Sequence, residues 1–369
     1  MFIKRLKTIG GTRNLTRYVH MLAGNSPYVP TTNSTAIFLP VNASPYMQVQ
    51  NWFNGTTTGF NSKYADPSVL PPSSVKDASW SRGKGYLSVA HGSSPYFRTY
   101  KFNDSTGFGT AYSNPTTLPT GSVNGIDLQV DDSIIFMAHD GSPSMSGYPF
   151  SIDSGYGTRF ANPATTPTPP GRGIKYFNQT LFVNSEYTPY LHAYPFSLSS
   201  LSYGTKYADP TTLPAYGGYS NPEMHPSGNA VASGGISGSF IYAWSSVSGF
   251  GTKYAAPAGN PYTYATSFSS TGDTVALGGQ NGSFIHAYPF TIAGGFGSKF
   301  SNPATLPTSP PYYNSVAFSY DAQTLAILTT ASPYVYAYSF SEVTGFGTKY
   351  NDPSTLLATG SFTGGINFN

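Results

Sequence analysis

The sequence predicts an all-β fold in which seven four-stranded units form a closed ring, a seven-bladed β-propeller. The first observation is a motif, Gly-Phe-Gly-Thr-Lys-Tyr-x-Asp-Pro-x-Thr-Leu-Pro, that recurs seven times with variations. Its copies begin at Gly59, Gly107, Gly155, Ser202, Gly249, Gly295 and Gly345. The second is their spacing, because the first proline of the motif recurs after 48, 48, 47, 47, 46 and 50 residues. A period of this length fits the four strands of one blade, and residues 34–369 accommodate seven such units.

The composition supports a β-rich core and excludes several classes of protein. Aromatic residues make up 16% of the chain and charged residues 9%, which argues against a charged disordered protein. The net charge is only +3, so we expect no surface that grips a nucleic-acid backbone. No apolar run approaches the roughly 18 residues of a membrane-spanning helix, so no membrane insertion is expected. The absence of cysteine excludes disulfides, thiolate chemistry and cysteine-ligated metals.

Two parts of unequal size are predicted, a basic N-terminal arm over residues 1–24 and the propeller over residues 25–369. The arm holds the basic residues Lys4, Arg5, Lys7, Arg13 and Arg17. No apolar stretch of about 7–15 residues follows them, so a cleaved secretory signal is not expected. The arm is either a partly ordered tail or a segment that docks on a neighbouring subunit, with these five side chains as anchors.

The last repeat shows the four expected strands of one unit most clearly. They lie over residues 314–322, where a strand leads into a turn, and over residues 324–329, 332–340 and 345–350. In the third of these segments Tyr334, Tyr336 and Tyr338 alternate with smaller residues, as they would on one face of a strand. Short segments of this kind, bounded by Gly, Pro, Asn and Ser, are typical of an all-β fold.

The two ends of the chain are predicted to meet in one blade. The C-terminal residues 360–369 align with residues 121–128, the first strand of an internal unit. Residues 35–39 and 44–50 look like second and third strands. We therefore expect residues 361–369 to complete the blade begun by residues 34–66, which removes an open sheet edge. The alternative is that Tyr28 and Val29 fill that place and the C-terminus is a tail.

The alternation of side chains along a strand explains the motif itself. Its two aromatic positions, Phe60 and Tyr64 in the first copy, point to the same side and are aromatic in all seven copies. They are predicted to pack between blades or at the outer edge of the ring. The basic position, Lys63 in the first copy, is predicted to discourage edge-to-edge pairing; a ring of lysines that binds phosphate or sulfated sugar is the alternative. The Asp or Asn before the proline is predicted to start a turn.

The strand–turn–strand pattern of WD40-type blades is similar to that of residues Phe268-Ser-Ser-Thr-Gly-Asp-Thr-Val-Ala-Leu-Gly-Gly-Gln-Asn-Gly282. The resemblance extends over all seven units and is strongest in the last three. It implies that loops from the second to the third strand, and from the fourth to the next first strand, share one face of the ring. That face would carry the candidate binding residues His91, Asp140, Arg172, Glu186, Tyr187 and Gln280. Variable loops on a rigid scaffold are where binding usually resides.

No catalytic pattern emerges from the sequence. There is no phosphate-binding loop, nucleophile elbow or zinc-protease helix motif. His192 and His286 occupy equivalent places in third strands, and His91 and His139 end second strands. The six histidines are therefore predicted to be structural instead of metal ligands. The glutamates Glu186, Glu223 and Glu342 form no marked pair of the kind that glycoside hydrolysis needs. We therefore expect no enzymatic activity, no catalytic residues, no cofactor and no metal.

The repeats, built on Gly-Phe-Gly-Thr-Lys-Tyr-Ala-Asp-Pro, also resemble those of tailed-phage and prophage proteins with propeller repeats. This resemblance implies a virion structural protein of the tail or particle surface, present in several copies and assembled in the host cytoplasm. The arm would bind other virion proteins, and the propeller would face a host glycan or protein. The first alternative is a secreted or surface lectin-like propeller that binds glycans. The second is a cytosolic WD40-like scaffold for protein interactions.

Overall fold

The computed structural model describes residues 35–53, 59–81, 83, 85–129, 133–214, 220–235, 238–257, 262–355 and 365–369. The N-terminal arm with its five basic anchor candidates lies outside these residues, as does the alternative closing segment at Tyr28 and Val29. Within the described part of the chain every regular element is a strand. That part accordingly holds no helix of the length and hydropathy that crossing a membrane requires.

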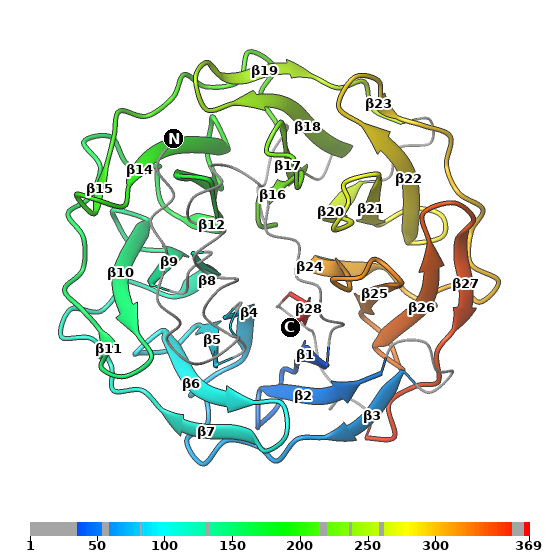
Figure 1. Ribbon diagram of the computed structural model, residues 1–369, viewed down its shortest axis with the longest axis horizontal. Helices are drawn as coiled ribbons and strands as arrows, with labels where there is room; N and C mark the ends of the chain where they lie inside the picture. The colour runs from blue at the N-terminus through cyan, green and yellow to red at the C-terminus, as the bar shows by residue number, and fades with distance from the viewer. Residues whose placement is uncertain are drawn as a thin grey trace, which may run out of the picture.

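The described strands form five antiparallel sheets of four strands and one of eight, arranged around a central axis (Figure 1). The eight-stranded sheet consists of two sets of four, joined through Gly235 opposite Thr263. We call the seven sets blades 1 to 7, numbered in chain order from the set that contains residues 36–63. The innermost strands are β28 (Asn367–Phe368), β4 (Val75–Trp80), β8 (Val123–Leu128), β12 (Gly171–Phe177), β16 (Glu223–Met224), β20 (Thr263–Phe268) and β24 (Pro311–Phe318). The second strands are β1 (Ala36–Pro40), β5 (Tyr86–His91), β9 (Ile134–His139), β13 (Thr180–Ser185), β17 (Ala230–Gly235), β21 (Thr274–Gly279) and β25 (Thr324–Thr329).

The third strands are β2 (Met47–Trp52), β6 (Phe97–Asn103), β10 (Met145–Ser151), β14 (Leu191–Ser197), β18 (Gly238–Ser245), β22 (Ile285–Thr291) and β26 (Val335–Ser341). The fourth strands, at the rim, are β3 (Phe60–Lys63), β7 (Gly107–Ala111), β11 (Gly155–Tyr156), β15 (Ser202–Tyr203), β19 (Gly249–Lys253), β23 (Gly295–Phe296) and β27 (Gly345–Lys349). The predicted all-β propeller is therefore confirmed, and the motif supplies the fourth strand of each blade.

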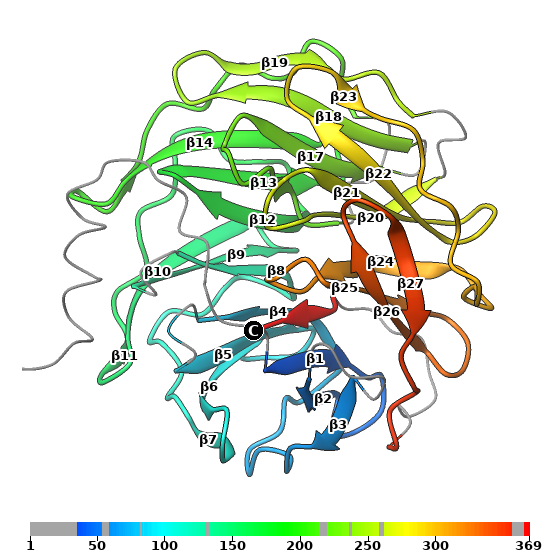
Figure 2. The ribbon, with the colours of Figure 1, turned by 45° about the vertical axis from the view of Figure 1, so that its right-hand side comes forward.

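The C-terminal strand closes the ring, as predicted. β28 pairs with β1 through Ile37 opposite Phe368 and Phe38 opposite Asn367, and Figure 2 shows it between β1 and β4. The last residue adds a cap, because the Asn369 Oδ1 atom accepts hydrogen bonds from the backbone N–H groups of Thr35 (2.9 Å) and Ala36 (2.8 Å). Residues more than 330 positions apart in the sequence thus complete one sheet.

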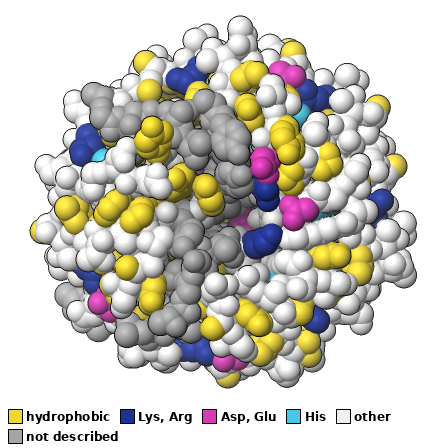
Figure 3. Space-filling view, turned by 180° about the vertical axis from the view of Figure 1, so that it is seen from behind, with side chains coloured by type: hydrophobic (Ala, Val, Ile, Leu, Met, Phe, Trp, Pro, Cys, Tyr) yellow, Lys and Arg dark blue, Asp and Glu magenta, His cyan; other side chains and the backbone are white. Residues whose placement is uncertain are grey.

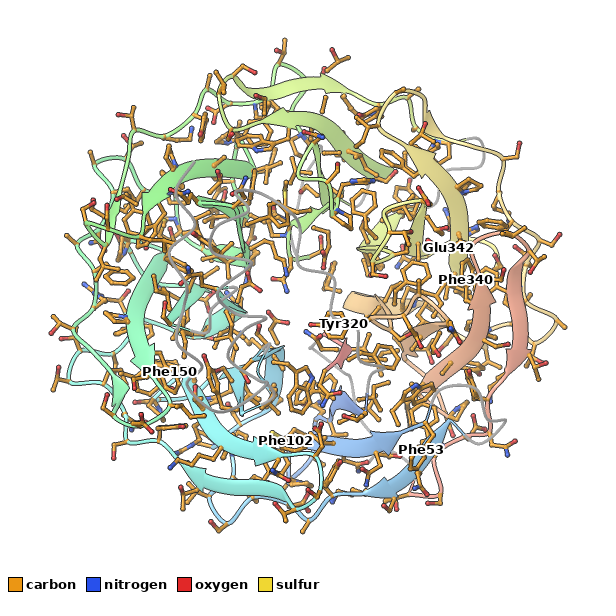
Figure 4. All side chains as sticks on the ribbon, viewed as in Figure 1. Phe53, Phe102, Phe150, Tyr320, Phe340 and Glu342 are labelled. Atoms are coloured by element: carbon orange, nitrogen blue, oxygen red, sulfur yellow. The ribbon has the colours of Figure 1, made fainter. Side chains whose placement is uncertain are left out.

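The hydrophobic core is divided into interfaces between neighbouring blades. In the described residues seven clusters of buried side chains occur, and each combines residues of two adjacent blades. The second strands are buried along their whole length, which suits strands covered on both faces. Phe102, Phe150 and Phe340, labelled in Figure 4, occupy equivalent places in the third strands. Each makes an edge-to-face contact with the first motif aromatic of its own blade, as in the 5.3 Å pair of Phe102 and Phe108.

The second motif aromatic connects each blade to the next one along the chain. The Tyr64 hydroxyl donates to the carbonyl of Asp104 (2.6 Å), and the Tyr112 hydroxyl donates to that of Ile152 (2.8 Å). The ring of Tyr64 also lies against Gly107, the first residue of the following motif copy, which has a φ of +79°. The motif glycine is required both because φ is positive and because a Cβ atom there would lie 2.9 Å from Tyr64 Cδ1.

Replacement of this glycine by alanine tests the connection between blades. We expect Gly107→Ala to lower the free energy of unfolding by roughly 2–4 kcal/mol, from the left-handed backbone and the displaced Tyr64 ring together. Gly155→Ala is a matched variant, because its φ of +78° is nearly the same but a Cβ atom would lie 3.4 Å from Tyr112. It should cost only the backbone term, about 1–2 kcal/mol. Urea unfolding measures both, and equal losses would show that the ring contact contributes nothing.

The basic position and the turn acid of the motif bind each other. Lys63 and Asp66 form an ion pair at 2.7 Å, and Lys206 with Asp209 and Lys349 with Asp352 repeat it. These pairs are partly exposed, so each contributes at most about 1 kcal/mol. In these copies the lysine is thus engaged by the turn of its own motif copy.

Candidate functional site around the ring axis

Four innermost strands carry a β-bulge at the same place, where each strand begins. The pairing with the second strand shifts by one residue between Val75 and Asp77, and the equivalent shift occurs in blades 3, 4 and 6. The residues left between the paired positions are Lys76, Asn124, Arg172 and Tyr264. In blade 7 a longer irregularity between Pro311 and Val316 contains Tyr313. A bulge bends the strand and re-aims a side chain, so the fold presents a set of polar and aromatic groups around the axis.

Five side chains from blades 2, 3 and 4 form a continuous polar chain at this end of the strands. We call it the axial cluster, and it comprises Lys76, Asn124, Asp140, Arg172 and Glu186. The Lys76 ammonium donates to Asn124 Oδ1 (2.8 Å), and Asn124 Nδ2 donates to Asp140 Oδ1 (2.7 Å). Arg172 Nη1 donates to Asp140 Oδ1 (3.4 Å), and its Nε atom donates to Glu186 Oε2 (3.1 Å).

The axial cluster balances two basic and two acidic groups. Burial lowers the pKa of Lys76, the Asp140 carboxylate opposes this shift, and the Arg172 guanidinium adds to it. The side chains of Arg172 and Glu186 are about one-fifth exposed, at 22% and 19%, whereas Asp140 is 41% exposed. Figure 3, which draws one face of the ring, shows basic and acidic side chains side by side near its centre. The cluster therefore offers hydrogen-bond donors and acceptors together, at a surface that carries no net charge.

Aromatic side chains from blades 6 and 7 lie at the corresponding ends of their innermost strands. The rings of Tyr264 and Tyr313 meet edge to face with centroids 4.9 Å apart, and both side chains are half-buried. Tyr262, at the start of the same strand segment, is 48% exposed. Its carbonyl accepts a hydrogen bond from the backbone N–H of Gln280 (3.0 Å). The surroundings of the axis are therefore polar on the side of blades 2–4 and aromatic on the side of blades 6 and 7.

Farther along the innermost strands a buried carboxyl group joins three blades. Asp77 is 2% exposed, and its Oδ2 atom accepts hydrogen bonds from the Ile126 N–H and from Asn221 Nδ2, each 2.9 Å long. Asn221 belongs to blade 5, and its side chain passes beside Gly125 and Gly173 to contact Asp77 in blade 2. A Cβ atom on Gly125 would lie 2.9 Å from the Asn221 Oδ1 atom, so these glycines leave the path open.

Three further titratable groups accompany Asp77. Burial raises the pKa of Asp77 to about 7, although its hydrogen bonds act in the opposite direction. Burial also raises the pKa of Glu223, which the Lys175 ammonium partly offsets. The Lys175 ammonium lies 3.3 Å from Asp127 Oδ1. Within the described residues no group of three or more His, Asp or Glu side chains is arranged to hold a metal ion.

The structure brings some of the predicted site residues together and separates others. Asp140, Arg172 and Glu186 meet in the axial cluster, and Tyr187 follows Glu186 with 53% of its surface exposed. Gln280 is exposed and lies on the side of the aromatic groups.

The prediction for His91 needs correction. It belongs to β5, has no exposed surface, and burial lowers its pKa to about 4. His91 is the last residue of β5 and its side chain is buried, so it does not face a ligand at the loop surface. His139, at the equivalent position of β9, is also fully buried, and burial lowers its pKa to about 4.

Lys76, Asn124, Tyr264 and Tyr313 were not predicted as site residues. Asn124 lies within a predicted first strand and Tyr313 immediately precedes another, so neither stands apart from ordinary strand residues. The available signal was the alignment of the repeats, because Lys76 and Asn124 occupy the same place as Arg172. That place holds a large polar or aromatic residue in blades 2, 3, 4 and 6.

Comparison with known proteins identifies the fold and no family. No protein-family model matches the chain, and no curated protein matches its sequence. Among solved structures, the Pseudomonas aeruginosa periplasmic gluconolactonase PpgL is similar with a TM-score of 0.63 and 15% identity, over 90% of this chain and 98% of that one. A protein proposed to be a 6-phosphogluconolactonase, from Bacteroides fragilis, gives a TM-score of 0.66 and 10% identity over 93% and 100% of the two chains.

The chain is also similar in structure to a propeller of the WD40 type. The β-propeller domain of Cps50 (Swd1) from Myceliophteria thermophila is similar with a TM-score of 0.57 and 12% identity, over 84% of this chain and 97% of that one. The fold is a β-propeller. Identities this low establish the fold alone, and function must be argued from the site.

The comparison corrects one prediction. The expectation that the chain has no enzymatic activity is wrong, because similar propellers include proteins named as gluconolactonases. Its basis was the absence of known catalytic motifs. A propeller site is assembled from several blades, so its reactive groups leave no local pattern in the sequence.

Proposed function

We propose that this propeller is a binding platform for carbohydrates and that its site is the surface around the ring axis. The observation that carries the proposal is the set of equivalent bulges, which places Lys76, Asn124, Arg172 and Tyr264 around one axis. Bulges are over-represented next to functional sites, because they re-aim side chains. A strand irregularity repeated in blades that differ in sequence supports a role for the residues that it leaves between the paired positions.

The chemistry of these groups matches that of a sugar ring. Each sugar hydroxyl can both donate and accept a hydrogen bond, and the axial cluster supplies both kinds of partner. Lys76 and Arg172 only donate, Asp140 and Glu186 only accept when ionised, and Asn124 does both. Tyr264 and Tyr313 offer aromatic surface of the kind that fills binding sites together with a few placed polar groups. The balance of charge favours a neutral polyhydroxylated ligand over a strongly charged one.

A glycan array followed by calorimetric titration of the best sugar tests the proposal. We expect Arg172→Ala to weaken binding at least tenfold, because it removes two donors and leaves the Asp140 and Glu186 carboxylates without their cation. Tyr264→Ala should also weaken binding, through loss of aromatic contact. Lys349→Ala is the control, because it removes a basic side chain that is paired with Asp352 at the rim. Wild-type affinity in both Arg172→Ala and Tyr264→Ala would place the sugar elsewhere and end the proposal.

The same experiment includes a test for turnover. Because two similar propellers are named as gluconolactonases, a sugar lactone is the first compound to assay for hydrolysis. Acid release measured at constant pH distinguishes binding alone from binding followed by reaction. The candidate groups for proton transfer are Asp77 and Glu223, because the pKa of each is raised by burial.

We also propose a setting for this platform, as a component of a phage particle that displays the propeller towards a host glycan or protein. The support is the low-charge, cysteine-free composition and the basic arm with Lys4, Arg5, Lys7, Arg13 and Arg17. Several copies would assemble with other virion proteins in the host cytoplasm. Deletion of residues 1–24 should leave sugar binding intact and abolish incorporation into particles. Full incorporation of the truncated chain would contradict the role of the arm.

A further inference from the structure

Blade 4 lacks a hydrogen bond that is present in blades 3, 5 and 7. The third strand of most blades carries a buried tyrosine, and in blades 3, 5 and 7 its hydroxyl donates to the carbonyl of a motif threonine. These bonds join Tyr148 to Thr117 (2.8 Å), Tyr242 to Thr212 (2.8 Å) and Tyr338 to Thr305 (2.9 Å). The equivalent pair in blade 4 is Tyr194 and Thr165, and this bond is not formed. Tyr194 has no exposed surface. Its hydroxyl, like those of Tyr100 in blade 2 and Tyr288 in blade 6, has no hydrogen-bond partner in the part of the chain that the structure describes.

A second hydroxyl at the interface of blades 3 and 4 has also lost its partner. In blade 3 the first motif aromatic, Tyr156, donates to Thr99 Oγ1 of blade 2 (2.5 Å). The equivalent residue in blade 4 is Tyr203, and the position of Thr99 is taken in blade 3 by Gly147. Glycine offers no side-chain acceptor. Among the described residues the buried Tyr203 hydroxyl accordingly has no hydrogen-bond partner.

A cation without a carboxylate lies at the same interface. Arg159 occupies the basic position of the motif, but the residue three positions later is Asn162, where Lys63, Lys206 and Lys349 have an aspartate. Its Nη1 atom is buried and has no partner in the described part of the chain. Because a guanidinium can only donate, this atom lacks an acceptor. A buried donor left in this state costs about 1–3 kcal/mol.

These groups are close to one another and to a hollow at the rim. The rings of Tyr194 and Tyr203 have centroids 6.5 Å apart. Burial raises the pKa of Tyr203, the Arg159 guanidinium opposes that shift, and Tyr194 adds to it. The hollow is lined by Thr165, Tyr203, Lys206 and Asp209, among others. Lys206 and Asp209 pair with each other, so Arg159 gives this interface a net positive charge.

We propose that the interface of blades 3 and 4 is a binding site for a small oxyanion group, such as a phosphate, a sulfate or a carboxylate. The Arg159 guanidinium and the hydroxyls of Tyr194 and Tyr203 are its donors. Three donors without acceptors suit an oxyanion, because each of its oxygens accepts and hydrogen bonds to an ionised acceptor are the strong ones. Of the three donor residues Tyr203 lines the hollow, through which an anion would enter either free or as the end of a larger ligand. The site is separate from the axial cluster and does not depend on the carbohydrate proposal.

Inorganic phosphate is the probe for this site, with sodium chloride at equal ionic strength as the reference. We expect phosphate to raise the melting temperature of the wild type as its concentration increases. Arg159→Gln should lose this response and weaken phosphate binding at least tenfold in calorimetry. Tyr203→Phe should reduce the response without lowering the melting temperature in chloride, because its hydroxyl has no partner to lose. Tyr156→Phe is the matched control, which should be less stable in chloride but keep the full response to phosphate.

Two outcomes would overturn the proposal. One is a wild-type melting temperature that is the same in phosphate, sulfate and chloride, which would assign the buried donors to water. The other is a full response in Arg159→Gln, which would place the anion elsewhere. If a variant fails to fold, the wild-type protein alone can be tested by phosphorus NMR. Binding should broaden the resonance of phosphate with the wild type, and a control protein of similar charge should not broaden it.

Discussion

Removal of residues 365–369 is expected to lower the free energy of unfolding by roughly 5 kcal/mol or more, enough to leave many chains unfolded. Ile366 and Phe368 are 4% and 3% exposed, and each buried side chain of this size contributes about 1.5–3 kcal/mol. Phe368 also meets Trp52 edge to face at 5.4 Å. The truncation in addition exposes the edge of β1, which is otherwise paired with β28. Urea unfolding followed by tryptophan fluorescence measures the loss directly.

A point variant separates the strand from its cap. Asn369→Ala keeps β28 and removes the side-chain hydrogen bonds to Thr35, Ala36 and Asp104, so it should cost about 1–3 kcal/mol. The truncated chain should also aggregate at lower protein concentration than either full-length form, because its sheet edge is open. A truncated chain as stable as the wild type would mean that the pairing of β28 with β1 contributes nothing to ring closure.

Stability should depend on pH through Asp77 in a way that Asp77→Asn removes. The folded pKa of about 7 is far above the ordinary value of 3.8, so the unfolded chain loses this proton first as pH rises. Near pH 4 the carboxyl holds its proton in the folded state and imposes little cost. As the pH rises from 4 to 7 the unfolded chain ionises while the folded state keeps its proton, so stability falls, and a shift of about three units corresponds to roughly 4 kcal/mol. The variant should therefore become more stable than the wild type as the pH increases.

The difference between Asp77→Asn and wild type is the quantity to measure, because the buried histidines act in the opposite direction. The low pKa values of His91 and His139 make folding less favourable as the pH falls below 6.5. Ser79→Ala is the control, since it removes a comparable bond from an innermost strand to the next blade without removing a titratable group. Its loss of stability should be equal at pH 5 and pH 9. A pH-independent difference for Asp77→Asn would show that Asp77 is ionised throughout this range.

The fold could be predicted because every blade repeats the same local information. Seven copies of one motif count the units, and the alternation of Tyr334, Tyr336 and Tyr338 indicates a strand. Closure by the C-terminus was predictable for the same reason, because residues 360–369 align with the first strand of another unit. The pattern did not reveal which motif copies contact one another. The ring of Tyr64, for example, lies against Gly107 of the following motif copy and not against the glycine of its own copy.

The candidate site was only partly predictable, because its residues are defined by register. Arg172 and Glu186 stood out as charged residues in variable loops. Lys76, Asn124 and Tyr264 become special only because a bulge leaves each of them between paired positions. Pairing across strands decides where a bulge occurs, and the sequence of one strand does not contain it. The prediction for His91 failed because a residue at the end of a strand can point into the core instead of towards the neighbouring loops, and His91 is buried.

The contact between successive motif copies also operates between the last blade and the first. The ring of Tyr350 lies against Gly59, where a Cβ atom would come within 2.8 Å of it, and meets Trp52 edge to face at 5.1 Å. At the rim, the junction between blades 7 and 1 thus repeats a contact that five other junctions make. The contacts at the rim therefore do not distinguish this junction from those five. The difference lies near the axis, where β28 from the C-terminus pairs with β1. The protein is in this sense cyclic in its packing while linear in its covalent structure, and a circularly permuted chain would keep every rim contact.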